Sequence, residues 1–189
     1  MITPKVPAVV TSSSSATTYF VELILRQGTT VVDRNVYWQS TYPDEVNWSK
    51  TLDGQNAETY AVMTQYANLQ GLQKLAKSTL KVTAVSSSQS GPNGADTVTD
   101  VTITNTSTTP TVGFFLRTDL RKGNAAGVPQ SGDNEVTGAL WSNNDTTLWP
   151  GESETVSVTY KASNLDGATP VISFSGFNAA TQDIAAPLG

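Results

Sequence analysis

The stretch that decides the fold is residues 99–116, which read TDVTITNTSTTPTVGFFL. Side chains of a β-strand alternate between two faces, and apolar or β-branched residues recur here at every second position. The positions that share a face are Thr99, Val101 and Ile103 in the first half, and Val112, Phe114 and Leu116 in the second half. The polar run at 105–107 and Pro110 separate the halves, as turn residues do. The stretch therefore predicts two strands joined by a turn.

The same alternation continues on both sides of this stretch. Strands are expected at 80–84, 135–142, 146–149, 154–160 and 170–177, with a turn at 86–95 and a polar loop at 121–134. Short strands that recur roughly every 8–12 residues, with turn signals between them, are typical of an all-β, antiparallel β-sandwich. The pattern predicts one such domain over residues 78–180, followed by a tail at 181–189.

A β-hairpin is predicted near the amino terminus. Apolar residues alternate over 19–25, and a return strand follows at 30–38. Between them lies Gly28, which can take the positive φ that a tight turn needs. Because an isolated hairpin is only marginally stable, we expect residues 1–45 to be the terminal strands of a preceding, incomplete β-sandwich domain.

Residues 46–77 lack this alternation and are expected to form an ordered connector. Within 68–77, leucines recur at a spacing of three residues, which predicts a short helix. From residue 41 to 77, large amphipathic aromatic residues occur at irregular spacing, as in a segment that lies across another protein surface. These proposed interdomain docking residues are Tyr42, Trp48, Tyr60 and Tyr66.

The composition excludes several classes of function. The chain contains no cysteine and no histidine, which removes disulfides, thiolate nucleophiles, histidine-based triads and the usual zinc ligands. Its net charge of −5 argues against a nucleic-acid partner, because phosphate binding needs clustered Lys and Arg. No apolar run approaches the ~20 residues of a membrane span, so no membrane partner is expected.

No catalytic residue, metal site or cofactor is predicted. The 16 Asp and Glu residues allow pairs such as Glu152 and Glu154, and a glycosidase needs two carboxylates about 5–10 Å apart. The pairs in this chain lie beside turns in polar surroundings, so they are expected to be ordinary solvated acids. The aspartates show no EF-hand or repeat spacing that would indicate calcium.

The tryptophans allow a sugar-binding and a structural interpretation. Pyranose rings stack on exposed aromatic rings, which makes Trp149, before a Pro-Gly turn, and Trp48, in the connector, possible sugar-contacting residues. Tryptophans on the strands of a sandwich more often pack in the core or between domains. We expect this structural role for Trp38 and Trp141, and it stays open for the other two.

Three sites fit the pattern for N-glycosylation. They are Asn47, Asn105 and Asn144. In a chain this rich in Ser and Thr, about three such matches are expected by chance, given the usual pattern definition. They permit a eukaryotic secreted origin without supporting one.

A series of motifs along the chain together resembles a known family. The motifs are NVYWQST at 35–41, Trp48, YANLQGL at 66–72, VTITNTS at 101–107, FFLR at 114–117, WSNN at 141–144, LWPGES at 148–153 and SGFN at 175–178. In order and spacing they resemble the late segment of exo-β-D-glucosaminidases of glycoside hydrolase family 2, over about residues 17–180. The later motifs are similar to the carboxy-terminal immunoglobulin-like domain of such enzymes. Phe177 and Trp149 depart from the family's usual Trp and Leu, which leaves the substrate open.

The resemblance implies an accessory role within a larger secreted enzyme. Members have a sugar-binding-like sandwich, an immunoglobulin-like domain, a (β/α)₈ catalytic barrel and two further sandwiches. This chain would hold the end of the fourth domain, the connector and the fifth domain, an immunoglobulin-like antiparallel β-sandwich. The family's catalytic glutamates lie in the barrel, so none can be assigned here. The implied partners are the barrel and the neighbouring sandwich domains, with chitosan or another polysaccharide as a further candidate, and the implied location is extracellular, with the signal peptide outside this chain.

Alternative functions remain open at this stage. The chain could correspond to the same region of a family 2 β-mannosidase, to a free-standing carbohydrate-binding immunoglobulin-like module, or to a structural immunoglobulin-like repeat. We expect sugar binding by the isolated chain to be weak or undetectable, because a solitary aromatic platform gives little affinity after immobilisation costs.

Overall fold

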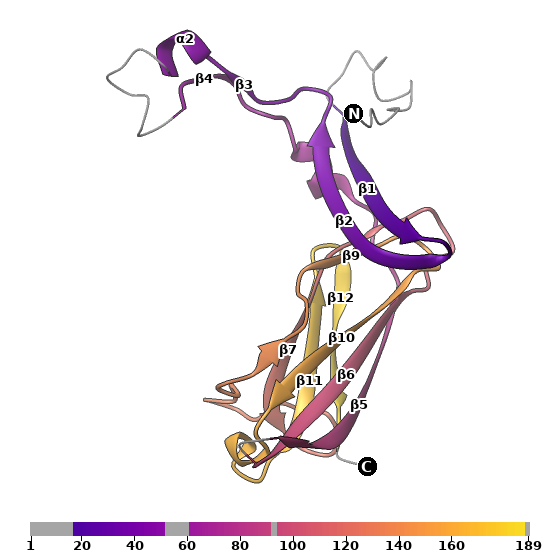
Figure 1. Cartoon of the computed structure of the whole chain (residues 1–189), viewed down its shortest axis with the longest axis vertical. Coiled ribbons are helices and arrows are strands. Elements are labelled where there is room, and N and C mark those ends of the chain that lie inside the picture. The colour runs from indigo at the N-terminus through magenta and orange to yellow at the C-terminus, as the bar shows by residue number, and fades with distance from the viewer. Residues whose placement is uncertain (1–16, 52–60, 92–93, 188–189) are drawn as a thin grey trace. The chain divides into compact units, whose positions relative to one another are not determined.

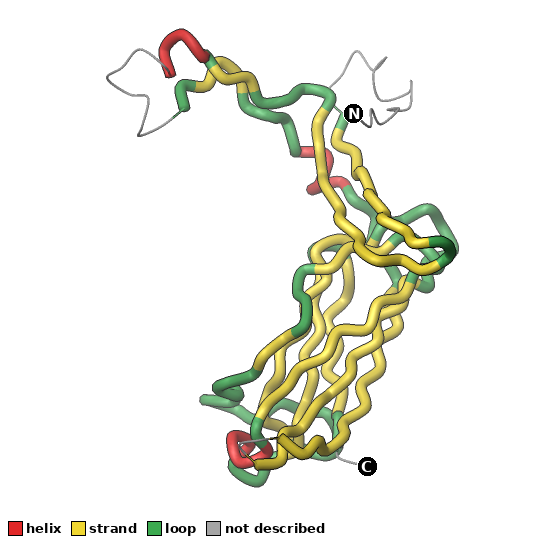
Figure 2. Tube along the Cα trace, viewed as in Figure 1, coloured by secondary structure: helices red, strands yellow, loops and turns green. Residues whose placement is uncertain are grey.

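The computed structural model describes residues 17–51, 61–91 and 94–187, and the chain divides into two compact units. Unit 1 ends at Leu75 and unit 2 begins at Ala76. Figure 1 labels most strands of both units, and Figure 2 shows that strands make up most of unit 2. Within the described residues, no helix has the length and apolar character needed to cross a membrane.

Unit 1 is built on the predicted hairpin. Strand β1, Thr18–Gln27, pairs antiparallel with β2, Thr30–Ser40, in a register that places Phe20 opposite Trp38. Gly28 in the turn has a φ of 62°, in the left-handed region that favours glycine. The hairpin predicted from the alternation at 19–25 and 30–38 is therefore confirmed, with slightly longer strands.

The connector contains a two-stranded ribbon that the sequence pattern did not predict. Strand β3, Glu45–Val46, pairs antiparallel with β4, Met63–Gln65, and helix α2, Trp48–Thr51, follows β3. Strands of two and three residues are too short to show a period of two, which explains why the alternation test missed them.

The helix expected within 68–77 is a short 3₁₀-helix, η1, Gln70–Lys74. It ends at Leu75, whose ψ of 130° is extended. Its Gly71 lies directly against β1, because a Cβ built at this position would be 2.6 Å from Thr18 Oγ1. Glycine is therefore what allows the connector to pack on the hairpin within unit 1.

Unit 2 is an immunoglobulin-like β-sandwich of two four-stranded antiparallel sheets, as predicted. In spatial order, the first sheet contains β5, Leu80–Gly91; β6, Gly94–Asn105; β10, Ser153–Tyr160; and β8, Leu140–Trp141. The second contains β12, Ala179–Ala185; β11, Thr169–Gly176; β7, Gly113–Gly123; and β9, Thr146–Leu148. A second 3₁₀-helix, η2, Ala162–Leu165, joins β10 to β11.

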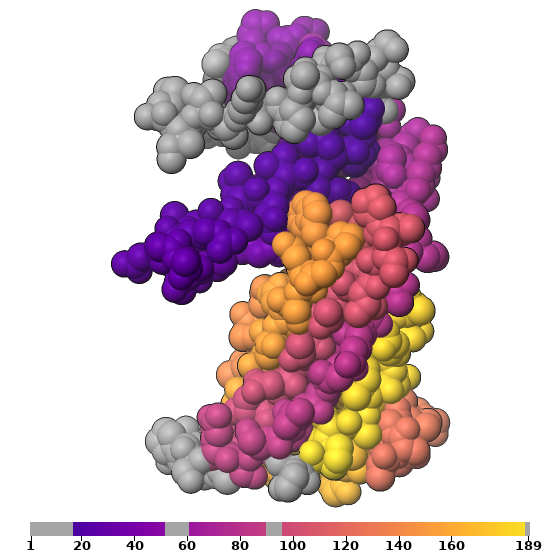
Figure 3. Space-filling model, turned by 90° about the vertical axis from the view of Figure 1, so that its right-hand side faces the viewer, coloured from indigo at the N-terminus to yellow at the C-terminus, as the bar shows by residue number. Residues whose placement is uncertain are grey.

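The two sheets meet along one side, where β5 and β12 lie next to each other. In Figure 3 these strands form adjacent magenta and yellow bands. Gln182 of β12 donates a hydrogen bond from Nε2 to the carbonyl of Leu80, at 3.1 Å. This side-chain to backbone bond joins two edge strands that belong to different sheets.

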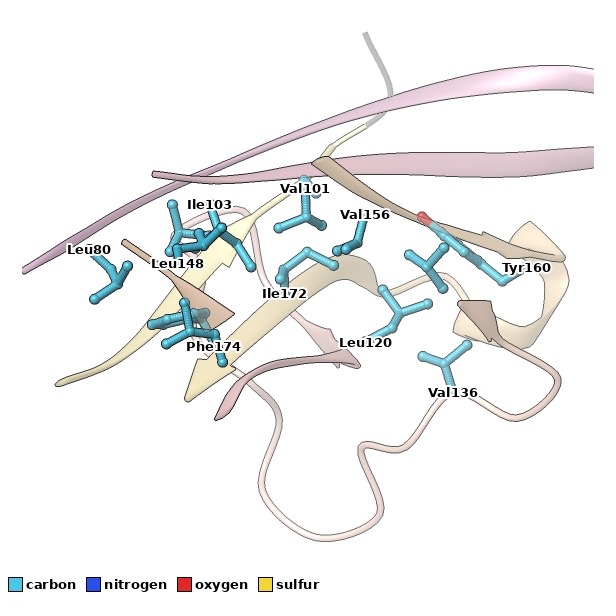
Figure 4. Close-up of a cluster of buried hydrophobic side chains, with 14 of the residues drawn as sticks. Leu80, Val101, Ile103, Leu120, Val136, Leu148, Val156, Tyr160, Ile172 and Phe174 are labelled. Carbon is cyan, nitrogen blue, oxygen red and sulfur yellow. The ribbon is translucent and has the colours of Figure 1, made fainter. Parts of the chain in front are cut away.

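The core lies between the sheets and includes Val101, Ile103 and Leu116, which the alternation predicted to share a face of their strands, whereas Val112 is only half-buried. The buried cluster includes Leu80, Val101, Ile103, Leu116, Leu120, Leu148, Val156, Val158, Tyr160, Ile172 and Phe174, many of which Figure 4 shows as sticks. Burial of this apolar surface is the main driving force for folding of unit 2.

Two predicted connections are shorter than expected. Strand β5 continues to Gly91 and β6 begins at Gly94, so the connection between them has fewer residues than the turn expected at 86–95. Strand β7 likewise extends to Gly123, into the loop expected at 121–134. In both places polar residues continue the strand because a neighbouring strand supplies hydrogen bonds to their backbone.

Two further expectations about strands need correction. Within 135–142 only β8, Leu140–Trp141, is a strand, although Glu135 forms an isolated bridge with Arg121. The tail expected from residue 181 is instead part of β12, which pairs with β11. This strand has a single large apolar residue, Ile184, so its sequence carries almost no hydrophobic alternation.

A chain of buried hydroxyl groups links strands of the first sheet to Ala186, the residue that follows β12. Ser86 Oγ donates to the carbonyl of Ala186 at 2.6 Å and lies 2.7 Å from Thr99 Oγ1, which lies 3.1 Å from the Tyr160 hydroxyl. Because a carbonyl can only accept, the Ser86 proton is committed to Ala186. Thr99 must then donate to Ser86, and Tyr160 must donate to Thr99.

Thr99 lies in the middle of this one-way chain and takes part in two of its hydrogen bonds, whereas Tyr160 takes part in one. We expect Thr99→Val to lower the free energy of unfolding by about 2 kcal/mol and Tyr160→Phe by about 1 kcal/mol, since only the first change interrupts two bonds. Thr102→Val, on the solvent face of β6, removes one exposed hydrogen bond to Thr155 and should cost less than about 0.5 kcal/mol. Urea unfolding of unit 2 measures all three, and equal losses for Thr99→Val and Thr102→Val would contradict the one-way chain.

Candidate functional site

Exposed aromatic rings in the connector are the first candidates for contact with a partner or ligand. The exposed fractions of Tyr42, Trp48 and Tyr66 are 50%, 64% and 74%. Tyr60, the fourth proposed docking residue, lies outside the described residues. Exposed aromatic rings of this size are therefore the residues of the connector to consider first for contact with a partner.

The two tyrosines lie on a hydrogen-bonded scaffold. The backbone N–H of Asn68 donates to the carbonyl of Tyr42 at 3.0 Å, and the N–H of Ala67 donates to Asp44 Oδ1 at 2.9 Å. These bonds extend the pairing of β3 and β4 toward the hairpin. We call the resulting two-chain segment, residues 42–46 and 63–68, the connector ribbon.

Trp48 begins helix α2, and the residue before it caps that helix. Asn47 Oδ1 accepts hydrogen bonds from the backbone N–H of Lys50 at 3.1 Å and from Ser49 Oγ at 2.8 Å. A side-chain oxygen that satisfies an otherwise unpaired N–H is the usual N-cap arrangement. The possible glycosylation site at Asn47 is therefore also a structural cap.

The hairpin exposes large apolar side chains on both of its faces. The exposed residues are Leu23, Ile24, Leu25, Val31, Val32, Tyr37 and Trp38. Sequence neighbours in a strand point to opposite faces, so pairs such as Val31 and Val32 place apolar surface on each side. A hairpin that faced water on one side would instead be polar there.

Trp149 and Trp141 are partly covered within unit 2. Trp149 sits in a turn in which its backbone N–H donates to Glu152 Oε2 at 2.7 Å and its carbonyl accepts the Glu152 N–H at 3.0 Å. Trp141 packs on the edge of the core, in keeping with its expected structural role. Trp38, expected to behave in the same way, is 38% exposed on the hairpin.

The two other glycosylation patterns in unit 2 differ sharply in accessibility. Asn105 has 0% exposure, and its Nδ2 donates to the carbonyls of Thr111 and Leu148, both at 2.9 Å. A glycan replaces one of the two hydrogens of this nitrogen, so it would remove one of these bonds and would have to fit at a side chain with no exposed surface. The expectation for Asn105 is therefore corrected. Asn144 is exposed in the loop between β8 and β9.

Several charged side chains of unit 2 form ion pairs with one another. The Asp119 carboxylate lies between Arg117 and Arg121, at 3.8 and 3.6 Å. Asp166 accepts a hydrogen bond from Lys122 Nζ at 2.6 Å, which raises the pKa of that lysine. Among the described residues, no group of three or more acidic side chains is placed to hold a metal ion.

Comparison with known proteins identifies relatives over nearly the whole chain. Residues 58–179 match the family described as the exo-β-D-glucosaminidase Ig-fold domain. The chain is 38% identical, over 92% of its length, to an exo-β-D-glucosaminidase of Streptomyces avermitilis, and 35% identical, over 96%, to one from Amycolatopsis orientalis. These alignments cover only 18% and 16% of the two relatives.

A solved structure agrees with this assignment. The crystal structure of the Amycolatopsis orientalis exo-chitosanase aligns with 92% of this chain at 33% identity and a TM-score of 0.73, and 19% of that chain is covered. The chain therefore spans less than a fifth of the length of these relatives. The resemblance noted in the sequence is confirmed, and the chain belongs to the exo-β-D-glucosaminidase Ig-fold domain family.

Proposed function

We propose that this chain works as the non-catalytic accessory region of a secreted exo-β-D-glucosaminidase of glycoside hydrolase family 2. The observation that carries the proposal is the match over more than 90% of this chain to less than a fifth of each such enzyme. The family match favours this parent over a β-mannosidase. An extracellular location follows from the substrate, because a chitosan polymer does not cross a membrane unaided.

The accessory role consists of holding the immunoglobulin-like domain against the rest of the enzyme. The hairpin supports this idea most strongly, since both of its faces carry exposed apolar residues, and residues such as Leu25, at 61%, gain from being covered. The exposed rings of Tyr42, Trp48 and Tyr66 extend the docking surface along the connector, and we assign Tyr60 to the same role. Trp48 is also the one tryptophan open enough to serve as a sugar platform.

A chimera tests the proposal. The chain replaces the matching segment of the Streptomyces avermitilis relative, and release of glucosamine from chitosan oligomers is measured beside the unaltered enzyme and a variant that lacks the segment. We expect the chimera to hydrolyse chitosan oligomers, the deletion variant to lose activity and solubility, and the purified 189-residue chain to release no glucosamine. A folded chimera as inactive as the deletion variant, or hydrolysis by the chain alone, would refute the accessory role.

A further inference from the structure

Strand β7 of unit 2 begins with an irregularity that contains an exposed aromatic ring. The pairing of β7 with β9 shifts register between Gly113 and Leu116, where β7 holds one residue more than β9. An extra residue on one of two paired strands is a β-bulge. Within this interval Phe115 has a φ of 53°, in the left-handed region, and its side chain is 40% exposed.

Phenylalanine is an unusual residue for this backbone conformation. The left-handed region brings Cβ close to the following carbonyl oxygen, which destabilises residues that have a Cβ, and bulges with a left-handed residue normally place glycine there. Burial in the core does not explain the ring of Phe115, because it is 40% exposed. A strained residue that the core does not require is a candidate for contact with a partner.

A second exposed ring rests on the same buried ring as the first. Phe115 and Phe177 each make an edge-to-face contact with Phe114, with ring centroids 5.6 Å apart in both pairs. The backbone N–H of Phe177 also donates to the carbonyl of Phe114 at 3.0 Å. Phe114 is buried, whereas Phe177 is 51% exposed. We call Phe114, Phe115 and Phe177 the phenylalanine cluster.

A cationic side chain lies next to this cluster. Arg117 lies two residues beyond Phe115 on β7. Across the ladder it pairs with Ser175 of β11, which lies two residues before Phe177. The Arg117 side chain is 55% exposed, and its ion pair with Asp119 spans 3.8 Å, beyond hydrogen-bond distance. Within the part of the chain that the structure describes, its guanidinium therefore has N–H groups available for an acceptor on a partner.

From these contacts we propose that Phe115, Phe177 and Arg117 bind another domain of the parent enzyme, at an apolar surface that carries a carboxylate, an inference that rests on the proposed function. Protein interfaces are enriched in aromatic residues and arginine, and a guanidinium binds a carboxylate by strong, charge-assisted hydrogen bonds. The relatives extend well beyond the matched segment, which covers only 18% and 16% of them. Chitosan is a poorer occupant, because its ammonium groups would face the cationic Arg117.

Hydroxyl-radical footprinting, which measures the solvent exposure of individual side chains, tests the proposal. The 189-residue chain alone is compared with the folded chimera. We expect Phe115 and Phe177 to be oxidised readily in the isolated chain and to lose most of that reactivity in the chimera. Val85, 70% exposed on β5 of the other sheet, is the matched control and should react equally in both. Unchanged reactivity of the two phenylalanines, or equal protection of Val85, would overturn the proposal.

Two charge substitutions test the role of Arg117 in the chimera. Arg117→Gln should restore part of the reactivity of Phe115 and Phe177, because the carboxylate of the partner loses its cation. Lys81→Gln removes the same charge from an exposed position on β5 and should leave both rings protected. Equal loss of protection in the two variants would mean general charge attraction and would contradict a specific contact.

Two further substitutions test the backbone strain in the isolated chain. Phe115→Gly and Phe115→Ala both remove the ring, but only glycine takes a positive φ without strain. We therefore expect Phe115→Gly to resist urea at least as well as Phe115→Ala, although glycine has the more flexible unfolded chain. A clearly more stable alanine variant would show that Phe115 is not strained, and the argument for a partner would fall with it.

The footprint and the activity of the chimera can fail independently. If the chimera hydrolyses chitosan oligomers while both phenylalanines stay reactive, the accessory role stands and the proposed surface falls. If both rings are protected in a folded but inactive chimera, the surface stands and the accessory role falls. Protection of the rings in the isolated chain by a glucosamine hexamer, or by a higher protein concentration, would assign the surface to chitosan or to a second copy and would overturn the proposal.

Discussion

Asn178→Ala is expected to lower the free energy of unfolding of unit 2 by about 3 to 5 kcal/mol, near the upper end for a single substitution. The side chain is 2% exposed. Its Oδ1 accepts from the N–H of Phe114 at 2.9 Å, and its Nδ2 donates to the carbonyls of Ala76 at 2.7 Å and Val112 at 2.8 Å. Alanine removes all three partners and leaves three backbone groups without a hydrogen bond.

The position of Asn178 explains why one amide matters this much. It lies between β11 and β12, and its bonds reach the first residue of unit 2 and the start of β7. Its own carbonyl also accepts from the N–H of Ser78 at 2.8 Å and from Ser78 Oγ at 3.2 Å. Three segments far apart in sequence therefore meet at this residue.

Urea unfolding of Asn178→Ala, beside a surface asparagine, measures the effect. Asn143→Ala is the matched control, because its Nδ2 bond to Glu154 is exposed, and it should change stability by less than about 0.5 kcal/mol. Asn178→Asp keeps the acceptor for Phe114 but loses both donors, so it should be destabilised as well. Equal stability of Asn178→Ala and Asn143→Ala would show that the three bonds contribute little.

The strands that could be predicted from sequence are those whose inward residues are large and apolar. The segments predicted at 154–160 and 170–177 match β10 and β11 within one residue at each end. There, Val156 and Ile172 are almost fully buried, so the local pattern directly reports the tertiary core.

The strands that could not be predicted are those that exist only because their backbone forms hydrogen bonds to a neighbouring strand. Strand β12 is recognisable only through β11, and the end of β5 only through β6. Their side chains are small or polar, so hydrogen bonding of the backbone rather than burial of side chains defines them. The connector ribbon belongs to the same class, because backbone pairing of β3 with β4 holds it together.

Contacts between residues far apart in sequence also decided the outcome for the glycosylation patterns, and the local sequence does not reveal such contacts. The three-residue pattern at Asn105 is entirely local, whereas the burial of Asn105 depends on Leu148, 43 residues away. Sequence reasoning selects the residue type that can carry a glycan, but only the fold decides whether the amide nitrogen is free. At Asn105 both of its hydrogens are used to join the end of β6 to a loop and to β9.

Asn105→Asp should therefore be among the most damaging substitutions in unit 2, with a pH dependence that Asn178→Ala lacks. At neutral pH the change buries a carboxylate facing two carbonyl oxygens, and we expect a loss of about 3 to 5 kcal/mol, as for an uncompensated buried charge. Desolvation and the carbonyl dipoles disfavour ionisation, so the folded-state pKa of the introduced carboxyl rises above its unfolded value of about 3.9.

The sign of the pH dependence follows from that shift. Because the folded state holds the proton more tightly, the loss relative to the unaltered chain is smallest below about pH 4, grows as pH rises through the interval between the unfolded and folded pKa, and is then constant. Urea unfolding of both proteins at several pH values measures this difference. Asn144→Asp, in the exposed loop of unit 2, should show neither the loss nor the pH dependence. If the stability of Asn105→Asp relative to the unaltered chain does not change with pH, the introduced carboxyl is solvated, and Asn105 does not hold the buried position that the structure gives it.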